Sequence, residues 1–334
     1  MQLDADEVVD RGSYPEAVTP WEQATWRGEA LDWISHELDA HGLRASGPRR
    51  VRLRPWSVLV RLPVDDRTVW FKANPPASAF EAPLTDALSR WVPQHVLAPL
   101  SVSPDRGWCL LPDGGPLLRD VWDTGRAGSP AWEEALSQYA EMQHSLVTRT
   151  EELEALGVPG NRTPDLPEVF DRLVSASAVR ELADTRETAA WRPRVVEWCA
   201  ELSSAGIPDA LDHSDLHDGQ LFAPAPGRFT FFDWGDAAIT HPFCSLLVPA
   251  RAARDRFGSG ILPRLRDAYL EPWTGNGLTT GELHRALHLA WRLAAIGRAC
   301  SWERLFEGND ADKNPARGAE VLWWLRHMLT EPPL

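Results

Sequence analysis

Cysteine pairs and long apolar runs are both missing from the sequence. The four cysteines, Cys109, Cys199, Cys244 and Cys300, stand far apart and form no Cys-x-x-Cys motif. This spacing argues against zinc-finger and dithiol chemistry and favours reduced thiols in a cytoplasmic protein. No window approaches the ~20 apolar residues of a membrane span, and the acidic, polar N-terminus is unlike a signal peptide. We therefore expect a cytoplasmic protein with no membrane partner.

An excess of basic charge is also missing. The sequence has 34 Lys and Arg against 48 Asp and Glu, which gives a formal net charge of −14. Such an acidic chain has no electrostatic attraction to a phosphate backbone, so nucleic acid is not an expected partner. With 334 residues, 43% of them hydrophobic, the chain can fill two lobes. We expect it to act as a monomer or a homodimer.

The first third of the chain shows the alternation of β-strands. A helical pattern over 20–41 is followed through 51–71 by apolar residues that alternate with polar ones, with two interruptions at turn residues. This part of the sequence predicts three short antiparallel strands. A helix over 77–92 follows, and two more strands flank Asp105–Gly107. We therefore predict a small antiparallel sheet of five strands with one inserted helix.

Beyond residue 116 helical patterns dominate, broken by one strand-like stretch, "RFTFFDW". The expected helices cover about 130–149, 166–185, 188–204, 260–271, 279–306 and 317–330. Proline and glycine mark a linker before them. The expected parts are therefore a sheet-containing lobe over 1–111, a linker over 112–116 and a helical lobe over 117–334.

Two acidic loops in the helical part fit the needs of phosphoryl transfer. That reaction requires a carboxylate to take the hydroxyl proton and oxygen ligands for Mg²⁺, because its catalysis is mainly positioning and charge neutralisation. In "HSDLHDGQ" (213–220), Asp215 is the candidate base and the Gln220 amide oxygen a candidate ligand. A hairpin with a proline- and glycine-containing turn then brings Asp233, the main expected Mg²⁺ ligand, beside Gln220.

A lysine and a glutamate in the first part complete this set. Lys72 closes the third strand, and Glu81 lies near the start of the next helix, within plausible pairing distance. The pair is a candidate to hold the phosphates of a nucleotide. Pro83 leaves two alternatives: it lies inside the helix at a cost, or it begins the helix and leaves Glu81 ahead of it.

These motifs resemble the aminoglycoside phosphotransferase family of the protein-kinase-like superfamily. The family has a His-x-Asp-x-His-x-x-Asn loop and, after a hairpin, Asp followed by Trp, which stand here as "HSDLHDGQ" and "DWGD". "WSVLVRL", "VWFKA" and "WCLLPDGG" extend the similarity into the first part. The resemblance implies an α+β, bilobal protein-kinase-like fold that binds ATP or GTP with Mg²⁺ at the linker between the lobes. It also implies transfer to a hydroxyl of an aminoglycoside, another antibiotic or a sugar-like molecule.

The resemblance implies roles for several further residues. The linker backbone at Leu111–Gly114, which includes Asp113, is expected to bind the nucleotide base. His213 is expected to hydrogen-bond backbone and so fix the position of the catalytic Asp. His217 and Asp236 are expected to organise the loops or to lie on the acceptor side.

Two features depart from the family pattern. Gln220 stands where Asn is usual, although sugar kinases of the maltokinase and glucosamine kinase type, which resemble this family, also carry Gln there. The longer amide keeps the same ligating oxygen. There is also no Gly-x-Gly-x-x-Gly loop, because Pro55-Trp56-Ser57 occupies that turn. Backbone N–H groups and the Ser57 hydroxyl are the candidates to cover the phosphates there.

Two other functions stay open at this stage. His213, Asp215 and His217 alternate, so on a strand they would share one face and could hold zinc in a metal-dependent hydrolase. The other alternative is a catalytically inactive, kinase-shaped protein that binds nucleotide, for which Gln220 is the supporting feature.

Overall fold

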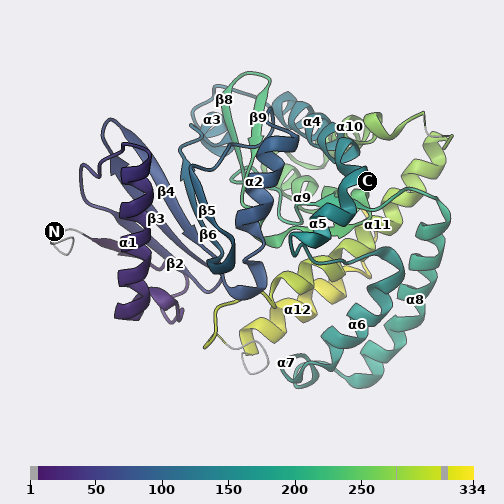
Figure 1. The fold of residues 1–334 in the computed structure, drawn as a ribbon. Coiled ribbons are helices and arrows are strands. Elements are labelled where there is room, and N and C mark those ends of the chain that lie inside the picture. The colour runs from purple at the N-terminus through teal and green to yellow at the C-terminus, as the bar shows by residue number, and fades with distance from the viewer. Residues whose placement is uncertain (1–6, 276, 310–314) are drawn as a thin grey trace. The chain divides into compact units, whose positions relative to one another are not determined.

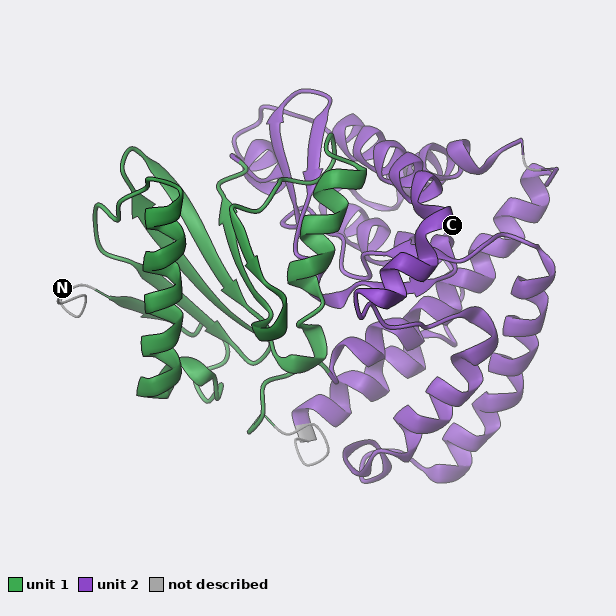
Figure 2. Cartoon of the chain, viewed as in Figure 1, with its two compact units in different colours: residues 1–114, 304–310 green, residues 115–303, 311–334 purple. Residues whose placement is uncertain are grey.

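The computed structural model describes residues 7–275, 277–309 and 315–334 (Figure 1). The chain divides into two units (Figure 2): unit 1 takes residues 1–114 and 304–310, and unit 2 takes 115–303 and 311–334. The first boundary falls within the linker expected at 112–116. The return of the chain to unit 1 near residue 306 was not expected from the sequence. There the N–H of Phe306 donates to the carbonyl of Pro55 at 2.8 Å.

Unit 1 is built on a sheet of six strands in the order β1-β2-β3-β4-β6-β5. The strands are β1 (Val8–Asp10), β2 (Arg50–Arg54), β3 (Ser57–Val64), β4 (Arg67–Ala73), β5 (Ser101–Ser103) and β6 (Trp108–Pro112). The five predicted strands are present and pair antiparallel. The sheet has six strands rather than the expected five, because an additional strand, β1, pairs in parallel with β2. The three residues of β1 are all exposed and show no alternation of buried and exposed positions.

Helix α1 (Ala24–Ala40) packs on this sheet (Figure 1). The predicted helix over 20–41 is confirmed, except that its first turn is a separate 3₁₀ turn, η1 (Pro20–Glu22). Ile34 and Leu38 of α1 are buried in the same core as the inward-facing residues of β2, β3 and β4. The period of two along each strand produces this apolar face. The sheet is therefore fixed by one continuous core.

Unit 2 is mainly helical. Its helices are α3 (Leu118–Asp123), α4 (Pro130–Leu146), α5 (Thr150–Ala155), α6 (Leu166–Ser175), α7 (Ser177–Arg180), α8 (Thr185–Ser204), α9 (Leu247–Phe257), α10 (Leu262–Leu270), α11 (Thr280–Ser301) and α12 (Pro315–His327). All six predicted helical stretches are confirmed with shifted ends, and 166–185 is split at Ala176, whose backbone is extended. Helices α3, α5 and α9 were missed. The first two are short, and Pro249 interrupts the pattern of α9 while lying in its first turn.

Two small antiparallel sheets lie among these helices. Strand β7 (Ala210–Asp212) pairs with β10 (Ala238–Thr240), and β8 (Leu221–Ala225) pairs with β9 (Arg228–Phe231). The second pair is the hairpin predicted from the sequence. The candidate loops follow β7 and β9, so the two strand pairs carry them.

Over the described residues, no helix combines the length and the apolar character that a membrane crossing requires.

Candidate active site

Lys72 and Glu81 form a buried ion pair within unit 1. The Nζ atom of Lys72 lies 2.7 Å from both carboxylate oxygens of Glu81, and the two side chains are 11% and 7% exposed. Helix α2 (Glu81–Trp91) begins at Glu81, so Pro83 is its third residue. The N–H that proline lacks has no helical partner in the first turn. Pro83 thus neither interrupts the helix nor displaces Glu81 from it.

Neighbouring residues fix the two partners of this pair. Lys72 lies on β4 between Leu59 of β3 and Cys109 of β6. The Asn74 amide donates to Oε2 of Glu81 and, at 3.3 Å, to the carbonyl of Ser78. Only two of the 34 basic residues of the chain are lysines. Lysine offers a compact ammonium where arginine offers a planar fork, so this choice of residue suits a single charged contact.

The other residues expected to touch the nucleotide also lie in unit 1. Leu111 belongs to β6, opposite Trp70 of β4, rather than to a free linker. The indole N–H of Trp70 donates to Oδ2 of Asp113 at 3.4 Å. Ser57 is the first residue of β3 and is buried, whereas Trp56 is exposed at the turn. The nucleotide contacts of these residues and of Gly114 remain predictions.

In unit 2 the loop after β7 holds the candidate base. Residues 213–220 form no strand, so the alternation of His213, Asp215 and His217 does not put them on one face. Ser214 has a φ of 62°, in the left-handed region that is rare for residues other than glycine. The chain therefore turns sharply just before Asp215.

His213 connects this loop to the loop that follows β9. Its ring is fully buried, and Nε2 lies 2.8 Å from the carbonyl of Phe232. A carbonyl oxygen only accepts hydrogen bonds, so Nε2 carries the proton. The backbone N–H of His213 also donates to the Tyr139 hydroxyl at 2.9 Å. Since Phe232 directly precedes Asp233, His213 links the positions of Asp215 and Asp233.

Gln220 and Asp233 are brought together by backbone pairing. Leu221 pairs with Phe231 across the hairpin, and the N–H of Phe232 donates to the carbonyl of Gln220 at 3.1 Å. Asp233 has φ 68° and ψ 59°, a left-handed conformation that costs about 1–3 kcal/mol outside glycine. A carboxylate and an amide oxygen from adjacent positions suit a hard cation such as Mg²⁺. The residues present therefore fit the metal that the resemblance implies.

Arg298 of α11 binds the candidate base, a contact that was not expected from the sequence. One guanidinium nitrogen lies 3.0 Å from Oδ1 of Asp215. The other lies 3.3 Å from Oδ2 of Asp236 and 3.0 Å from the carbonyl of Ser214. One signal was available: Arg298 interrupts the apolar stretch "LAAIGRAC", and a cation on a buried helix face needs partners.

The charges around Asp215 set its protonation. Burial raises the pKa of Asp215 above its ordinary value, Arg298 opposes this rise, and the charge of Asp236 adds to it. Although burial works against its charge, Asp215 and Asp236 hold the pKa of Arg298 above its ordinary value. The guanidinium therefore stays charged beside two carboxylates.

His217 faces the second oxygen of Asp215. Its Nδ1 accepts hydrogen bonds from the N–H of Gly219 at 3.0 Å and from Arg119 at 3.2 Å, so the proton is on Nε2. Nε2 lies 4.0 Å from Oδ2 of Asp215. Burial lowers the pKa of His217 below its ordinary value, against the pull of Asp215, which favours the neutral ring. His217 thus presents a neutral N–H donor beside the candidate base.

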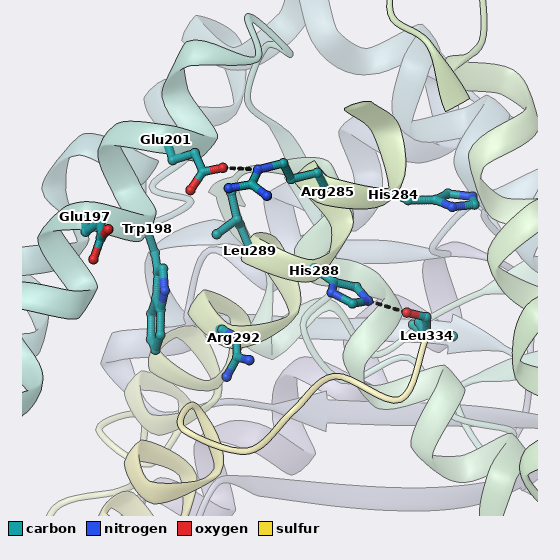
Figure 3. Close-up of a pocket in the computed structure, with 9 residues that line it drawn as sticks. All are labelled: Glu197, Trp198, Glu201, His284, Arg285, His288, Leu289, Arg292 and Leu334. Atoms are coloured by element: carbon teal, nitrogen blue, oxygen red, sulfur yellow. Dashed lines mark hydrogen bonds and ion pairs between the residues drawn. The ribbon is translucent and has the colours of Figure 1, made fainter. Parts of the chain in front are cut away.

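The geometry does not support the zinc-site alternative. The side chains of His213 and His217 are directed to separate partners, the carbonyl of Phe232 and the N–H of Gly219. Among the described residues, no three His, Cys, Asp or Glu side chains are placed to hold a metal ion together. His284 and His288, four residues apart on α11, line a separate pocket of 560 Å³ with residues of α8 (Figure 3).

Comparisons with known proteins give the fold. No family model and no curated protein sequence matches the chain. Among solved structures, the ethanolamine kinase of Plasmodium vivax is 14% identical, with a TM-score of 0.60 over 92% of this chain and 89% of that one. The macrolide 2′-phosphotransferase of Brachybacterium faecium is 15% identical, with a TM-score of 0.56 over 91% and 99%. A GDP complex of aminoglycoside 2′-phosphotransferase IIIa is 15% identical, with a TM-score of 0.54 over 90% and 98%.

The chain has the fold of small-molecule phosphotransferases. The α+β, protein-kinase-like architecture expected from "HSDLHDGQ" and "DWGD" is thereby confirmed. Sequence identities of this size establish the phosphotransferase fold alone, and chemistry must be argued from the residues of this chain.

Proposed function

We propose that the protein is a magnesium-dependent small-molecule kinase, which transfers the γ-phosphoryl group of ATP or GTP to a hydroxyl group. The main support is the backbone pairing that sets Gln220 beside Asp233 within the unit that also holds Asp215. This pairing supplies an oxygen donor set for Mg²⁺ next to a carboxylate loop, as phosphoryl transfer requires. The phosphotransferase fold supports the same class of reaction.

Each of these residues has a defined part in the proposed reaction. Asp215 orients the acceptor hydroxyl and takes its proton. Lys72, held by Glu81, neutralises charge on the α- and β-phosphates. Asp233 and Gln220 would hold Mg²⁺, which would supply positive charge to offset the negative charge of the phosphates.

Two further contacts with the nucleotide belong to the same proposal. The backbone at Leu111–Gly114 binds the nucleotide base, and N–H groups at the turn before Ser57 cover the phosphates. The GDP complex of the related fold supports nucleotide binding in general. We place the enzyme in the cytoplasm, as a monomer or homodimer.

An aminoglycoside, another antibiotic or a sugar is the proposed acceptor class. Neighbours named as ethanolamine, choline and macrolide kinases or phosphotransferases add amino alcohols and macrolides to the candidates. The test is a screen of these molecules for acceptor-dependent release of ADP or GDP, with Asp215→Asn as control. General-base catalysis is worth about 10²–10⁴ in rate, so the control should lose about a hundredfold or more.

The alternatives predict different experimental results. A loss in Asp215→Asn below about tenfold would remove Asp215 from its proposed part. If the protein binds nucleotide but no acceptor causes release of ADP or GDP, the inactive kinase-shaped protein would be favoured. Stoichiometric zinc in the purified protein, measured by elemental analysis, would favour the hydrolase.

A further inference from the structure

We propose that Arg298 is a positioning residue for phosphoryl transfer, which holds Oδ1 of Asp215 and leaves Oδ2 to take the proton of the acceptor hydroxyl. This inference rests on the proposed function. It goes beyond that function because it divides the two oxygens of the base between two tasks. It also gives a part in the reaction to a residue outside the two acidic loops.

The contacts of Arg298 explain why it can fix a carboxylate. Its side chain is 13% exposed, and its two terminal nitrogens reach Asp215 at 3.0 Å and Asp236 at 3.3 Å. The Ser214 carbonyl at 3.0 Å and the Ser301 hydroxyl at 3.4 Å are further partners. The guanidinium also lies over the ring of Trp324, 5.5 Å from its centre. A planar fork with five N–H groups can serve all these partners together, whereas a lysine ammonium cannot.

The other oxygen of Asp215 has a different neighbour. Oδ2 lies 4.0 Å from the Nε2–H of His217, which is beyond hydrogen-bond distance. A hydroxyl that reached Oδ2 could therefore donate to it, while the His217 N–H remained close enough to donate to the same hydroxyl oxygen or to the phosphoryl group. The assignment of Oδ2 as proton acceptor follows from this difference between the two oxygens.

The acceptor O–H bond breaks and its proton moves to Oδ2 of Asp215. The electron pair left on the acceptor oxygen forms the new bond to the γ-phosphorus. The bond from the γ-phosphorus to the bridging oxygen breaks, and its electron pair leaves with the nucleoside diphosphate.

The step requires Asp215 to be ionised, and Arg298 is the cation that favours this state. The groups that act on Asp215 are Arg298, Asp236, His217 and His213. Burial and Asp236 disfavour its charge, and Arg298 is the strongest group that favours it. Loss of Arg298 would leave the carboxylates of Asp215 and Asp236 without their shared cation. The proton affinity of Asp215 would then rise.

The effect of Arg298 on the pKa of Asp215 can be measured by carbon-13 NMR, without any acceptor. Aspartate is labelled at its side-chain carboxyl carbon, and Asp215→Asn identifies the signal of Asp215. In Arg298→Met the pKa of Asp215 should rise by about one unit or more, which is a tenfold or larger fall in the ratio of ionised to protonated Asp215 at a given pH. Arg298→Lys should give a smaller rise, and it decides the question even if the methionine variant does not fold. An unchanged pKa of Asp215 in both variants overturns the proposal.

Arg292→Met is the matched control on the same helix. Arg292 is buried to a similar degree, with 15% of its side chain exposed, and it lines the pocket shown in Figure 3 with its guanidinium 5.2 Å from the centre of the Trp198 ring. It also donates to the carbonyl of Thr330 at 2.8 Å. This control removes a comparable arginine from α11, so the titration of Asp215 should match that of the unmodified protein.

Kinetics with an active acceptor give the second readout. Arg298→Met should lower kcat about tenfold or more and move the acidic limb of the pH profile to higher pH, while the Kd of the nucleotide stays unchanged. Retention of kcat and of the acidic limb would overturn the role of Arg298 and leave the proposed function intact. If the unmodified protein neither binds nucleotide nor transfers phosphoryl groups, the proposed function fails, and the NMR titration still decides whether Arg298 governs Asp215.

Discussion

The hydroxyl of Ser245 donates a hydrogen bond of 2.6 Å to Oδ1 of Asp212, in a buried layer next to the candidate loop 213–220. Asp212 also accepts from the N–H of Ser214 at 2.8 Å and from its hydroxyl at 2.9 Å. These bonds hold Ser214 in its left-handed conformation and so direct the next residue, Asp215. The amide of Gln143 extends the layer to Ser245 and to the carbonyl of Leu211.

Asp212→Ala should therefore destabilise the protein. The substitution leaves the N–H of Ser214 and the Ser245 hydroxyl without their acceptor, at about 1–3 kcal/mol for each buried group. Denaturant unfolding followed by circular dichroism measures the loss. Ser204→Ala, an exposed position on α8, is the control. A change in unfolding free energy no larger than that of the control would contradict the network.

The charge of Asp212 should make stability depend on pH. Burial raises its pKa in the folded protein, against the hydrogen bonds from Ser245 and Ser214. Its contribution to stability is thus fully present below the pKa of the unfolded chain and is lost as pH rises through the folded value. Asp212→Asn resembles the protonated form and cannot ionise. As pH rises above about 4, the unmodified protein should therefore lose unfolding free energy relative to this variant. Urea titrations at several pH values provide the comparison, and a constant difference would count against the raised pKa.

Glu81→Ala should weaken both folding and nucleotide binding. Removal of one partner of a buried ion pair typically costs about 3–5 kcal/mol, because the remaining charge is buried alone. Lys72 would also lose the carboxylate that orients it. Thermal unfolding and calorimetric titration with ATP and GTP are the measurements. A double variant, Lys72→Met with Glu81→Leu, is the control: it should recover stability but not nucleotide affinity.

Asp233→Asn should remove the dependence of nucleotide binding on Mg²⁺ while leaving the fold intact. Asparagine tolerates the left-handed conformation of Asp233, so the change removes charge without adding backbone strain. Titrations with nucleotide in the presence and absence of Mg²⁺ should become alike. Gln220→Asn is the companion variant and should retain binding, since it keeps the amide oxygen. A Mg²⁺ effect that survives in Asp233→Asn would exclude this residue as the main ligand.

Asp236→Asn should shift the acidic limb of the activity profile to lower pH. The negative charge of Asp236 raises the pKa of Asp215, so its removal lets Asp215 ionise at lower pH. The direction is opposite to that expected for Arg298→Met, which makes the two variants a paired test. The pH dependence of kcat with one acceptor measures both. A shift of the same sign in the two variants would rule out the charge arrangement described.

The parts that the sequence predicted are those that local pattern determines. Lys72 lies one residue before the end of β4, and Glu81 begins α2. The hairpin after Gln220 sets the register that brings Asp233 close. Arg298 could not be assigned, because helical periodicity places it on an apolar face but does not identify the loop it meets. Strand β1 was missed because its three residues pair only through a contact that sequence alternation does not encode.

The return of the chain to unit 1 bears on how the protein is made. Phe306 is buried in the same core as Trp21 and Val51, although nearly two hundred residues of unit 2 separate it from the sheet in sequence. On the ribosome this core stays open until residue 306 has emerged, whereas most of unit 2 is complete by then. A fragment cut after residue 114 would carry an unfilled apolar hollow, and we expect it to bind chaperones and to aggregate.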